Sequence, residues 1–221
     1  KVTARLATLI IPESAAAEVK DLLEGSKSAV ATIPALDIVA ERFELFNKPL
    51  GRLELVASNE RGSAAAAPNA REWRINRLSM VNPDGNLQAT GKWLVRDGKS
   101  TTNLNFNLDI ADAGRLLDRM GFPDTLKRGK GKLSGDLSWN GLPYSLDAPT
   151  LSGAITLNVA AGQFLKKDPG AAKLLGVLSL QALPRLLKLD FHDVFSEGLA
   201  FDGISATAII ARGVLKTENL K

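Results

Sequence analysis

The sequence contains no cysteine and only one histidine among its 221 residues. Without thiols the chain can form neither a disulfide framework nor a thiolate metal site. A metal site would have to be built from carboxylates, and no acidic stretch shows the spacing of a calcium-binding loop. We therefore expect no metal and no cofactor.

Catalytic motifs are also scarce. His192 lies in "DFHDVF" between Asp190 and Asp193, where it could act as a general base with a carboxylate partner. Neighbouring residues of a strand point to opposite faces, however, and this alternation places His192 on the polar side, in a structural or surface role. The stretch "GKGKLSG" at 129–135 lacks the spacing of a phosphate-binding loop. An enzyme is disfavoured, and a hydrolase built around His192 is the weakest alternative.

Long apolar runs and strong charge are missing too. No segment is long enough to span a membrane, and the formal net charge is only +4. Basic residues are scattered except for a small cluster at 127–132, so we expect no nucleic-acid partner. The chain begins without Met and ends on a strand-like stretch. We therefore expect residues 1–221 to be a single excerpt of a longer protein whose targeting signals lie elsewhere.

Strict alternation of apolar and polar residues is the main pattern in the sequence. In "TTNLNFNLDI", residues 101–110, every second residue is apolar and the intervening ones are Asn or Asp. Similar stretches recur along the chain and predict half-buried strands, polar on one face and apolar on the other. The Asn-rich side is expected to be the solvated wall.

The first half of the chain predicts hairpins. Apolar residues alternate over 36–40 and then change parity at Phe43, which indicates a β-bulge near Glu41 and Arg42. A turn is expected at 47–49. The small, polar residues 59–72 are predicted to form an exposed flexible loop. Further turns are expected at 82–85, near 97–98 and at 212–213.

Three helices are predicted, at 13–24, 112–120 and 168–184. The third is apolar nearly all round, and at about 1.5 Å per residue it reaches roughly 22 Å, short of the ~30 Å hydrocarbon core of a bilayer. It could lie across the apolar face as core, cap the end of a groove, or dip into a membrane surface. The residues predicted to cap a groove are Leu174, Leu175, Leu178 and Leu180.

Three short helices are few for so many one-sided strands. The predicted fold class is therefore mainly β with a few helices: a long twisted antiparallel sheet curled into an open hydrophobic groove and capped by short helices. An ordinary closed core remains the alternative for each apolar strand position.

One segment carries a resemblance to a known family. "GQFLKKDPGAAKLLGVLSLQALPRLLKLDFHDVFSEGLAFD", residues 162–202, resembles the C-terminal part of AsmA-like proteins of the Gram-negative envelope. "IPALDIVAERFELFNKPLGRLEL" and "DAGRLLDRMGFPDTLKRGKGKLSGDLSW" fit the same family. The resemblance implies an inner-membrane anchor elsewhere in the protein and a periplasmic β-groove that carries phospholipid acyl chains toward the outer membrane. It supplies no catalytic motif.

Two functions follow as hypotheses. The first is a lipid conduit in a periplasmic portion of an inner-membrane-anchored protein, with phospholipids as partners and contact with both membranes through the full-length protein. The second is a structural scaffold whose same face binds another envelope protein over a closed, dry core. The residues expected to line a lipid groove are Leu104, Phe106, Leu108, Ile110, Leu133, Leu137, Trp139, Ile155, Leu157, Leu189, Phe191, Leu199 and Phe201.

Overall fold

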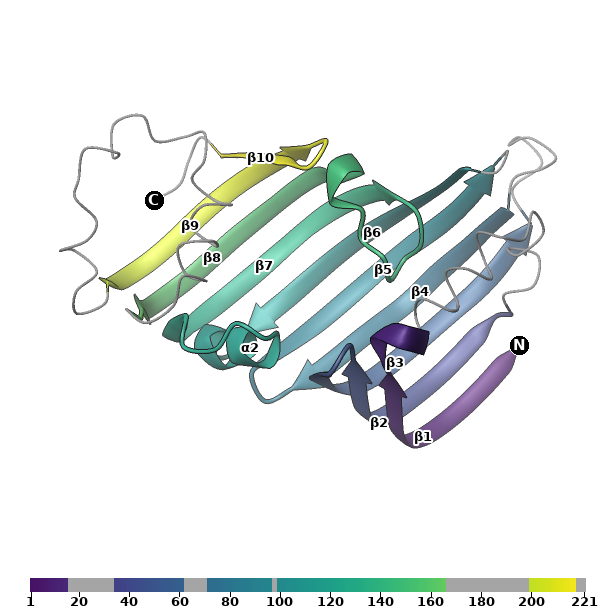
Figure 1. The fold of residues 1–221 in the computed structure, drawn as a ribbon, viewed down its shortest axis with the longest axis horizontal. Helices are drawn as coiled ribbons and strands as arrows, with labels where there is room; N and C mark the ends of the chain where they lie inside the picture. The colour runs from purple at the N-terminus through teal and green to yellow at the C-terminus, as the bar shows by residue number, and fades with distance from the viewer. Residues whose placement is uncertain (16–33, 62–70, 97–98, 166–198, 218–221) are drawn as a thin grey trace.

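In the described part of the chain, ten strands form one open sheet, in which every strand lies beside its neighbours in the sequence (Figure 1). The computed structural model describes residues 1–15, 34–61, 71–96, 99–165 and 199–217. The strands are β1 (Val2–Ile11), β2 (Leu36–Leu45), β3 (Lys48–Arg61), β4 (Arg71–Asn82), β5 (Gly85–Arg96), β6 (Lys99–Ile110), β7 (Leu126–Asn140), β8 (Ser152–Phe164), β9 (Leu199–Ala211) and β10 (Val214–Thr217). The predicted mainly-β class is confirmed.

Pairing is antiparallel from β2 to β10, as the alternation predicted. The β1–β2 pair departs from this rule because it is parallel, with Val2 opposite Leu36 and Ile11 opposite Leu45. Parallel neighbours need a crossover of a dozen or more residues, and the stretch 12–35 is long enough to return the chain to the same end of the sheet. A strand-by-strand alternation pattern carries no information about this direction.

The predicted bulge in β2 is confirmed. The register shifts between Ala40 and Phe43, and both side chains are buried on the same face. A second bulge separates Ile75 from Leu78 on β4. In each case two polar residues separate the two apolar ones, so in a regular strand the second apolar side chain would point outward. The extra residue of the bulge turns that side chain back to the inner face.

Tight turns connect the hairpins at or next to the predicted positions. The turn expected at 47–49 lies at 46–47 instead, because Lys48 pairs with Leu45 and already belongs to β3. Phe46 and Asn47 have φ of 53° and 60°, and Arg212 and Gly213 have φ of 50° and 73°. Positive φ at both central residues suits the right-handed twist of the flanking strands. The chain therefore reverses at 46–47 and 212–213 without extra loop residues. The turn expected near 97–98 lies outside the described residues.

The helix predicted at 112–120 is α2 (Ala113–Arg119). The Arg115 backbone N–H donates to Asp112 Oδ1 at 3.0 Å and thereby caps its first turn. A short 3-10 helix, η2 (Ala148–Thr150), lies in the connection from β7 to β8. Among the described residues no helix is long and apolar enough to cross a membrane.

Other predicted segments are only partly described. Residues 13–15 are helical, and the rest of the helix expected at 13–24 lies outside the described residues, as does the whole helix expected at 168–184. The loop predicted at 59–72 is shorter than expected at both ends, because β3 continues to Arg61 and β4 begins at Arg71. Ladder hydrogen bonds to neighbouring strands outweigh the polar composition of these end residues.

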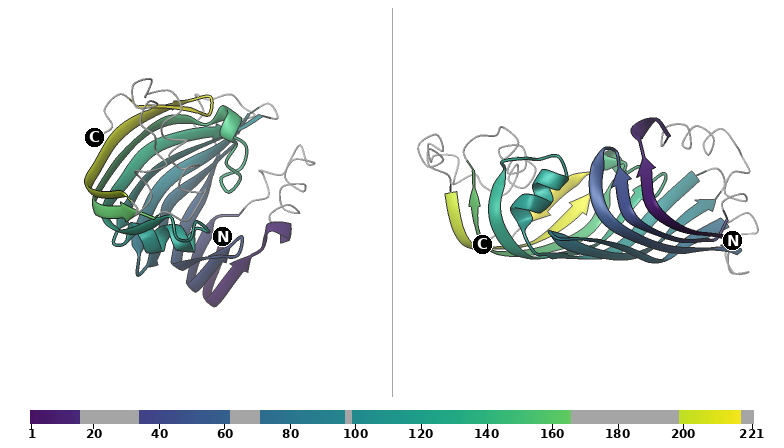
Figure 2. Two further views of the ribbon diagram at one scale, coloured as in Figure 1. Left: turned by 60° about the vertical axis from the view of Figure 1, so that its left-hand side comes forward. Right: turned by 90° about the horizontal axis from the view of Figure 1, so that it is seen from below.

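The sheet curves, and α2 lies inside the curve (Figure 2). The buried apolar residues form three clusters, one under α2, one around Trp73 and Trp93, and one between β2 and β3. Because α2 packs against Ile110, Leu126 and Val159, the inner side of the curve is the apolar face. No second sheet lies against this face among the described residues.

Candidate functional site

Apolar residues on neighbouring strands align into rows that run across the inner face. Leu104 stands opposite Gly91 on β5 and Leu137 on β7. Phe106 stands between Ala89 and Gly135 in the next row. The small residues Gly91, Ala89 and Gly135 lie beside these large ones, which lets a ring or a leucine lie over its neighbour's backbone. The rows continue from strand to strand without a polar interruption.

Most predicted lining residues lie together on this face and are half-buried. We call the middle of the face, between its two covered ends, the open strip. Its residues are Leu104, Phe106, Leu108, Leu133, Leu137, Ile155 and Leu157. The described helices and loops cover the two ends of the face and leave this strip partly exposed (Figures 1 and 2).

One end of the face is covered by α2. Ile110, predicted as lining, is only 7% exposed there and packs with Ala113, Leu126 and Val159. The helix lies very close to β7, since a Cβ on Gly114 would come within 2.3 Å of the Leu126 carbonyl oxygen. Ile110 is therefore a core residue beneath the helix.

A buried ion pair fixes α2 to the sheet. Arg119 donates from Nη2 to Asp84 Oδ2 at 2.5 Å and from Nη1 to the Pro49 carbonyl at 3.0 Å. The Asp84 side chain is 6% exposed and the Arg119 side chain 23%. A buried carboxylate needs such a partner, because leaving it unpaired is strongly unfavourable.

The other end of the face is covered by the connection 141–151, which contains η2. Trp139 is 3% exposed, and its Nε1 donates to the Leu142 carbonyl at 3.0 Å. The Thr102 hydroxyl donates to the Gly141 carbonyl at 2.8 Å. Leu142 itself packs into the cluster with Trp73 and Trp93. Trp139, also predicted as lining, is therefore a covered position like Ile110.

Phe201 extends the apolar face onto β9. Its ring lies 5.3 Å from that of Phe164, and a Cβ on the paired Gly162 would come within 2.4 Å of it. Leu199 begins β9 opposite Phe164. The remaining predicted site residues lie outside the described residues: Leu174, Leu175, Leu178, Leu180, Leu189, Phe191 and His192.

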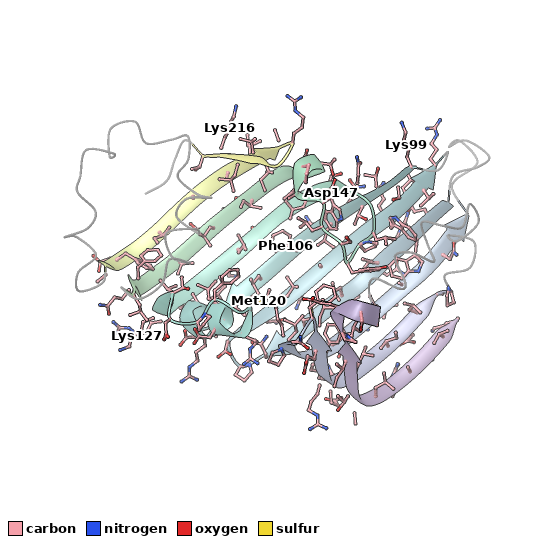
Figure 3. The ribbon with its side chains drawn as sticks, viewed as in Figure 1. Lys99, Phe106, Met120, Lys127, Asp147 and Lys216 are labelled. Carbon is pink, nitrogen blue, oxygen red and sulfur yellow. The ribbon has the colours of Figure 1, made fainter. Side chains whose placement is uncertain are left out.

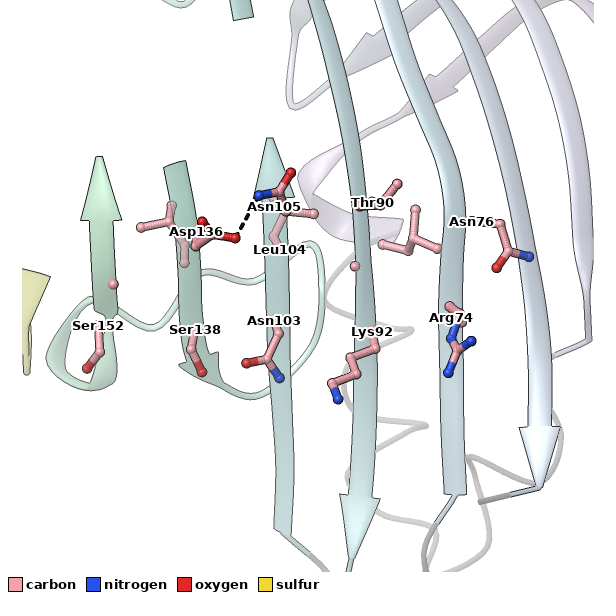
Figure 4. A pocket seen from close by; sticks show the side chains of 14 residues that line it. Arg74, Asn76, Thr90, Lys92, Asn103, Leu104, Asn105, Asp136, Ser138 and Ser152 are labelled. Carbon is pink, nitrogen blue, oxygen red and sulfur yellow. Dashed lines mark hydrogen bonds between the residues drawn. The ribbon is translucent and has the colours of Figure 1, made fainter. Parts of the chain in front are cut away.

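The outer face is polar, as the Asn side of 101–110 predicted. Asn105 and Asn107 are exposed, and Asn105 Nδ2 donates to Asp136 Oδ1 at 2.7 Å. Figure 4 shows this bond within a shallow hollow of about 760 Å³ that spans β4 to β8 on the outer face. Its polar lining comprises Arg74, Asn76, Thr90, Lys92, Asn103, Asn105, Asp136, Ser138 and Ser152. No cluster of metal-binding side chains occurs within the described ranges.

Comparison with known proteins gives the family. The model of the YhdP protein family matches residues 1–221, the whole chain. The chain belongs to the YhdP family. Over 134 residues it is 33% identical to the intermembrane phospholipid transporter YhdP of Escherichia coli K12, a match that covers 60% of this chain and 11% of that protein. The chain thus spans about a tenth of its curated relative. No solved structure matches it.

The YhdP relationship confirms the AsmA-like resemblance found in the sequence. The inner face includes more apolar residues than the sequence analysis named. Strands β2 to β5 contribute to the same face through Ile38, Ala40, Leu53, Leu55, Leu78, Met80, Leu87 and Ala89. The same alternation that marked β6 to β8 could have found them. Leu116 and Leu117, which pack from α2 onto the face, could not be placed there from spacing alone.

Proposed function

We propose that this chain is a segment of a phospholipid transporter and that its inner face carries acyl chains. The observation that supports the proposal is the open strip, an apolar surface without polar interruption that remains partly exposed between α2 and the connection 141–151. The E. coli relative is named an intermembrane phospholipid transporter, which agrees with such a surface.

The energetics suit a carrier. Each CH₂ group removed from water contributes about 0.8 kcal/mol, so several rows of leucine and phenylalanine can hold an acyl chain. Within each row, successive strands place one apolar residue after another about 4.8 Å apart. Neighbouring positions therefore have similar affinity, and a lipid can move from one to the next without a deep trap. This passive movement requires no cofactor and no catalytic residue.

The segment would act within the envelope. We propose that it forms a periplasmic part of a longer, inner-membrane-anchored protein that reaches both membranes. Headgroups would stay in water at the opening of the curve, while the acyl chains lie against the strip. This chain by itself would bind lipid without transferring it between membranes.

Photo-crosslinking in the full-length protein tests the proposal. A photoreactive residue at Phe106 should form adducts with phospholipid in cells, and the same group at Asn107, on the outer face, should not. Lipid extraction of the purified chain should also recover phospholipid. Adducts to protein alone at every position of the strip would reject the carrier and favour the scaffold that binds an envelope protein.

A further inference from the structure

The open strip lies between two covers that follow the long rims of the sheet. In Figure 3, Phe106 lies between Asp147, on the connection 141–151, and Met120, at the end of α2. The helix contacts both β7 and β3, so it extends along its rim over several strands. On this side the uncovered surface therefore ends at α2.

The connection 141–151 extends along the other rim in the same way. Leu142 packs with Trp73 on β4. At the far end of the connection, the Leu151 carbonyl accepts a hydrogen bond of 2.8 Å from the Gly213 N–H, in the β9–β10 turn. This cover thus reaches from β4 to β9, and the tryptophans beneath it are not available to a ligand on the strip.

Three rows of side chains cross the strip between the two covers. On β6 the rows pass through Leu104, Phe106 and Leu108, because Thr102 and Ile110 beyond them are only 0% and 7% exposed. At about 3.3 Å per residue, the two outer rows lie roughly 13 Å apart. On β7 and β8 the rows continue through half-buried residues, namely Leu137 and Gly153, Gly135 and Ile155, and Leu133 and Leu157.

The spacing of the side chains leaves room between the rows. Within a row, residues on neighbouring strands are about 4.8 Å apart, close enough for their side chains to touch. Between rows the separation is two residues, roughly 6.6 Å, whereas carbon atoms in contact are about 4 Å apart. We call the two spaces on either side of the Phe106 row furrows. An acyl chain in a furrow contacts side chains on both sides, whereas a chain along a strand would have to cross the rows.

The strip also has the length of one acyl chain. The outer rows continue on β5 through Leu87 and Gly91, which are half-buried. From β5 to β8 the strands span about 14 Å, close to the ~15 Å of hydrocarbon in one bilayer leaflet. Beyond these strands the row of Leu104 becomes covered, since Ile75 on β4 is 5% exposed and Ile210 on β9 is 8% exposed.

We propose that the open strip holds two acyl chains side by side, one in each furrow and both lying across the strands, and that it therefore prefers two-chain glycerophospholipids to four-chain ones. The inference rests on the proposed function. No charged residue lies in the three rows on β5 to β8, which suits hydrocarbon. A four-chain lipid places only two chains in the strip, so the CH₂ groups of the other two gain no stabilisation from burial there. Leu78 on β4 and Ala206 on β9 remain half-buried, so the strip stays connected to the rest of the face.

Native mass spectrometry of the purified chain at saturating lipid tests the number of acyl chains. We expect one bound molecule of phosphatidylglycerol and two of lysophosphatidylglycerol, which has a single acyl chain. Cardiolipin, which has four, should be retained at least about ten-fold less than phosphatidylglycerol at equal concentration.

The lipid count also distinguishes the two orientations. Chains lying along the strands would fit one per strand at about 4.8 Å, so β5 to β8 would hold about four lysolipids. Any count other than one phosphatidylglycerol and two lysolipids, or equal retention of cardiolipin, would overturn the proposal. If none of the three lipids binds, the proposed function fails instead.

Tryptophan substitutions that fill one furrow test the position of the chains. Leu137→Trp fills the furrow nearer the connection 141–151, and Leu157→Trp fills the furrow nearer α2. Each variant should bind one lysophosphatidylglycerol in place of two and retain phosphatidylglycerol at least about ten-fold less. Asn107→Trp, on the outer face, is the matched control and should keep both counts.

Circular dichroism checks the fold of each tryptophan variant. Unchanged lipid counts in a folded furrow variant, or an equal loss in the outer-face control, would overturn the proposal. If neither furrow variant folds, the count on the unsubstituted chain decides.

Discussion

At the scale of single residues, Phe106 has a distinctive place on the inner face. It is the largest side chain of the open strip and stands between Ala89 and Gly135, which leave room for its ring over their backbones. Its partial exposure separates it from covered positions such as Ile110 and Trp139. Under the proposed function, we expect substitution of Phe106 to affect lipid binding more than the fold.

The variant Phe106→Asp should keep the sheet and lose lipid. Replacing the ring removes about 1.5–3 kcal/mol of apolar contact and places a charge on the strip, so retained phospholipid should fall roughly ten-fold or more. Circular dichroism checks the fold, and lipid extraction followed by mass spectrometry checks binding. Asn107→Asp, on the outer face, is the matched control and should retain lipid. Unfolding of the Phe106 variant would instead indicate a closed core.

The backbone at position 153 requires glycine. Its φ is +143°, and a Cβ would lie 1.9 Å from the Asp136 carbonyl oxygen on the paired strand. We expect Gly153→Ala to lower the free energy of unfolding by more than about 2 kcal/mol, because both the backbone conformation and the clash oppose a side chain. Gly203→Ala, where the nearest atom is 3.8 Å away, should change it by less than about 1 kcal/mol. Urea unfolding measures both, and equal effects would contradict the structure.

At the scale of elements, α2 covers one end of the inner face and is joined to the rest of the molecule by Arg119 as well as by its packed leucines. Arg119→Ala removes the partner of a carboxylate that is 6% exposed, so the free energy of unfolding should fall by about 2–3 kcal/mol. Arg115→Ala is the control, since its side chain is 74% exposed and its nitrogen lies 3.9 Å from Asp112; a change within about 0.5 kcal/mol is expected there. Equal losses in urea unfolding would show that the Asp84 pair does not hold the helix.

The parallel strand β1 has an electrostatic link to β2. Hydrogen bonds from Lys1 and Arg5 hold the pKa of Asp37 below its ordinary value of 3.8. Because the pKa is lowered in the folded state, this contribution to stability is present above pH 3.8 and disappears as the pH falls through the lowered value. Carbon-detected NMR titration should show the Asp37 midpoint below 3.8, and Arg5→Gln should move it upward. A midpoint that does not move would show that Arg5 does not contribute.

At the scale of the whole molecule, the alternation of apolar and polar residues predicted features of the sheet beyond the existence of its strands. It predicted the polar outer face, the bulge at Ala40 to Phe43 and the turn at 212–213, because each depends on a period of two and on local turn chemistry. The direction of β1 and the burial of Ile110 beneath α2 could not be predicted. Both depend on contacts between segments far apart in the sequence, which local patterns do not record.

The sequential order of the strands has a consequence for how such a protein can change length. Every strand pairs only with its neighbours in the chain, so the sheet is built as a one-dimensional array. Adding or removing one hairpin would alter its span by about 10 Å while the inward and outward parity of all other strands stays the same. Evolution could therefore fit a protein of this kind to a wider or narrower gap through duplication or loss of hairpins, without redesign of its core.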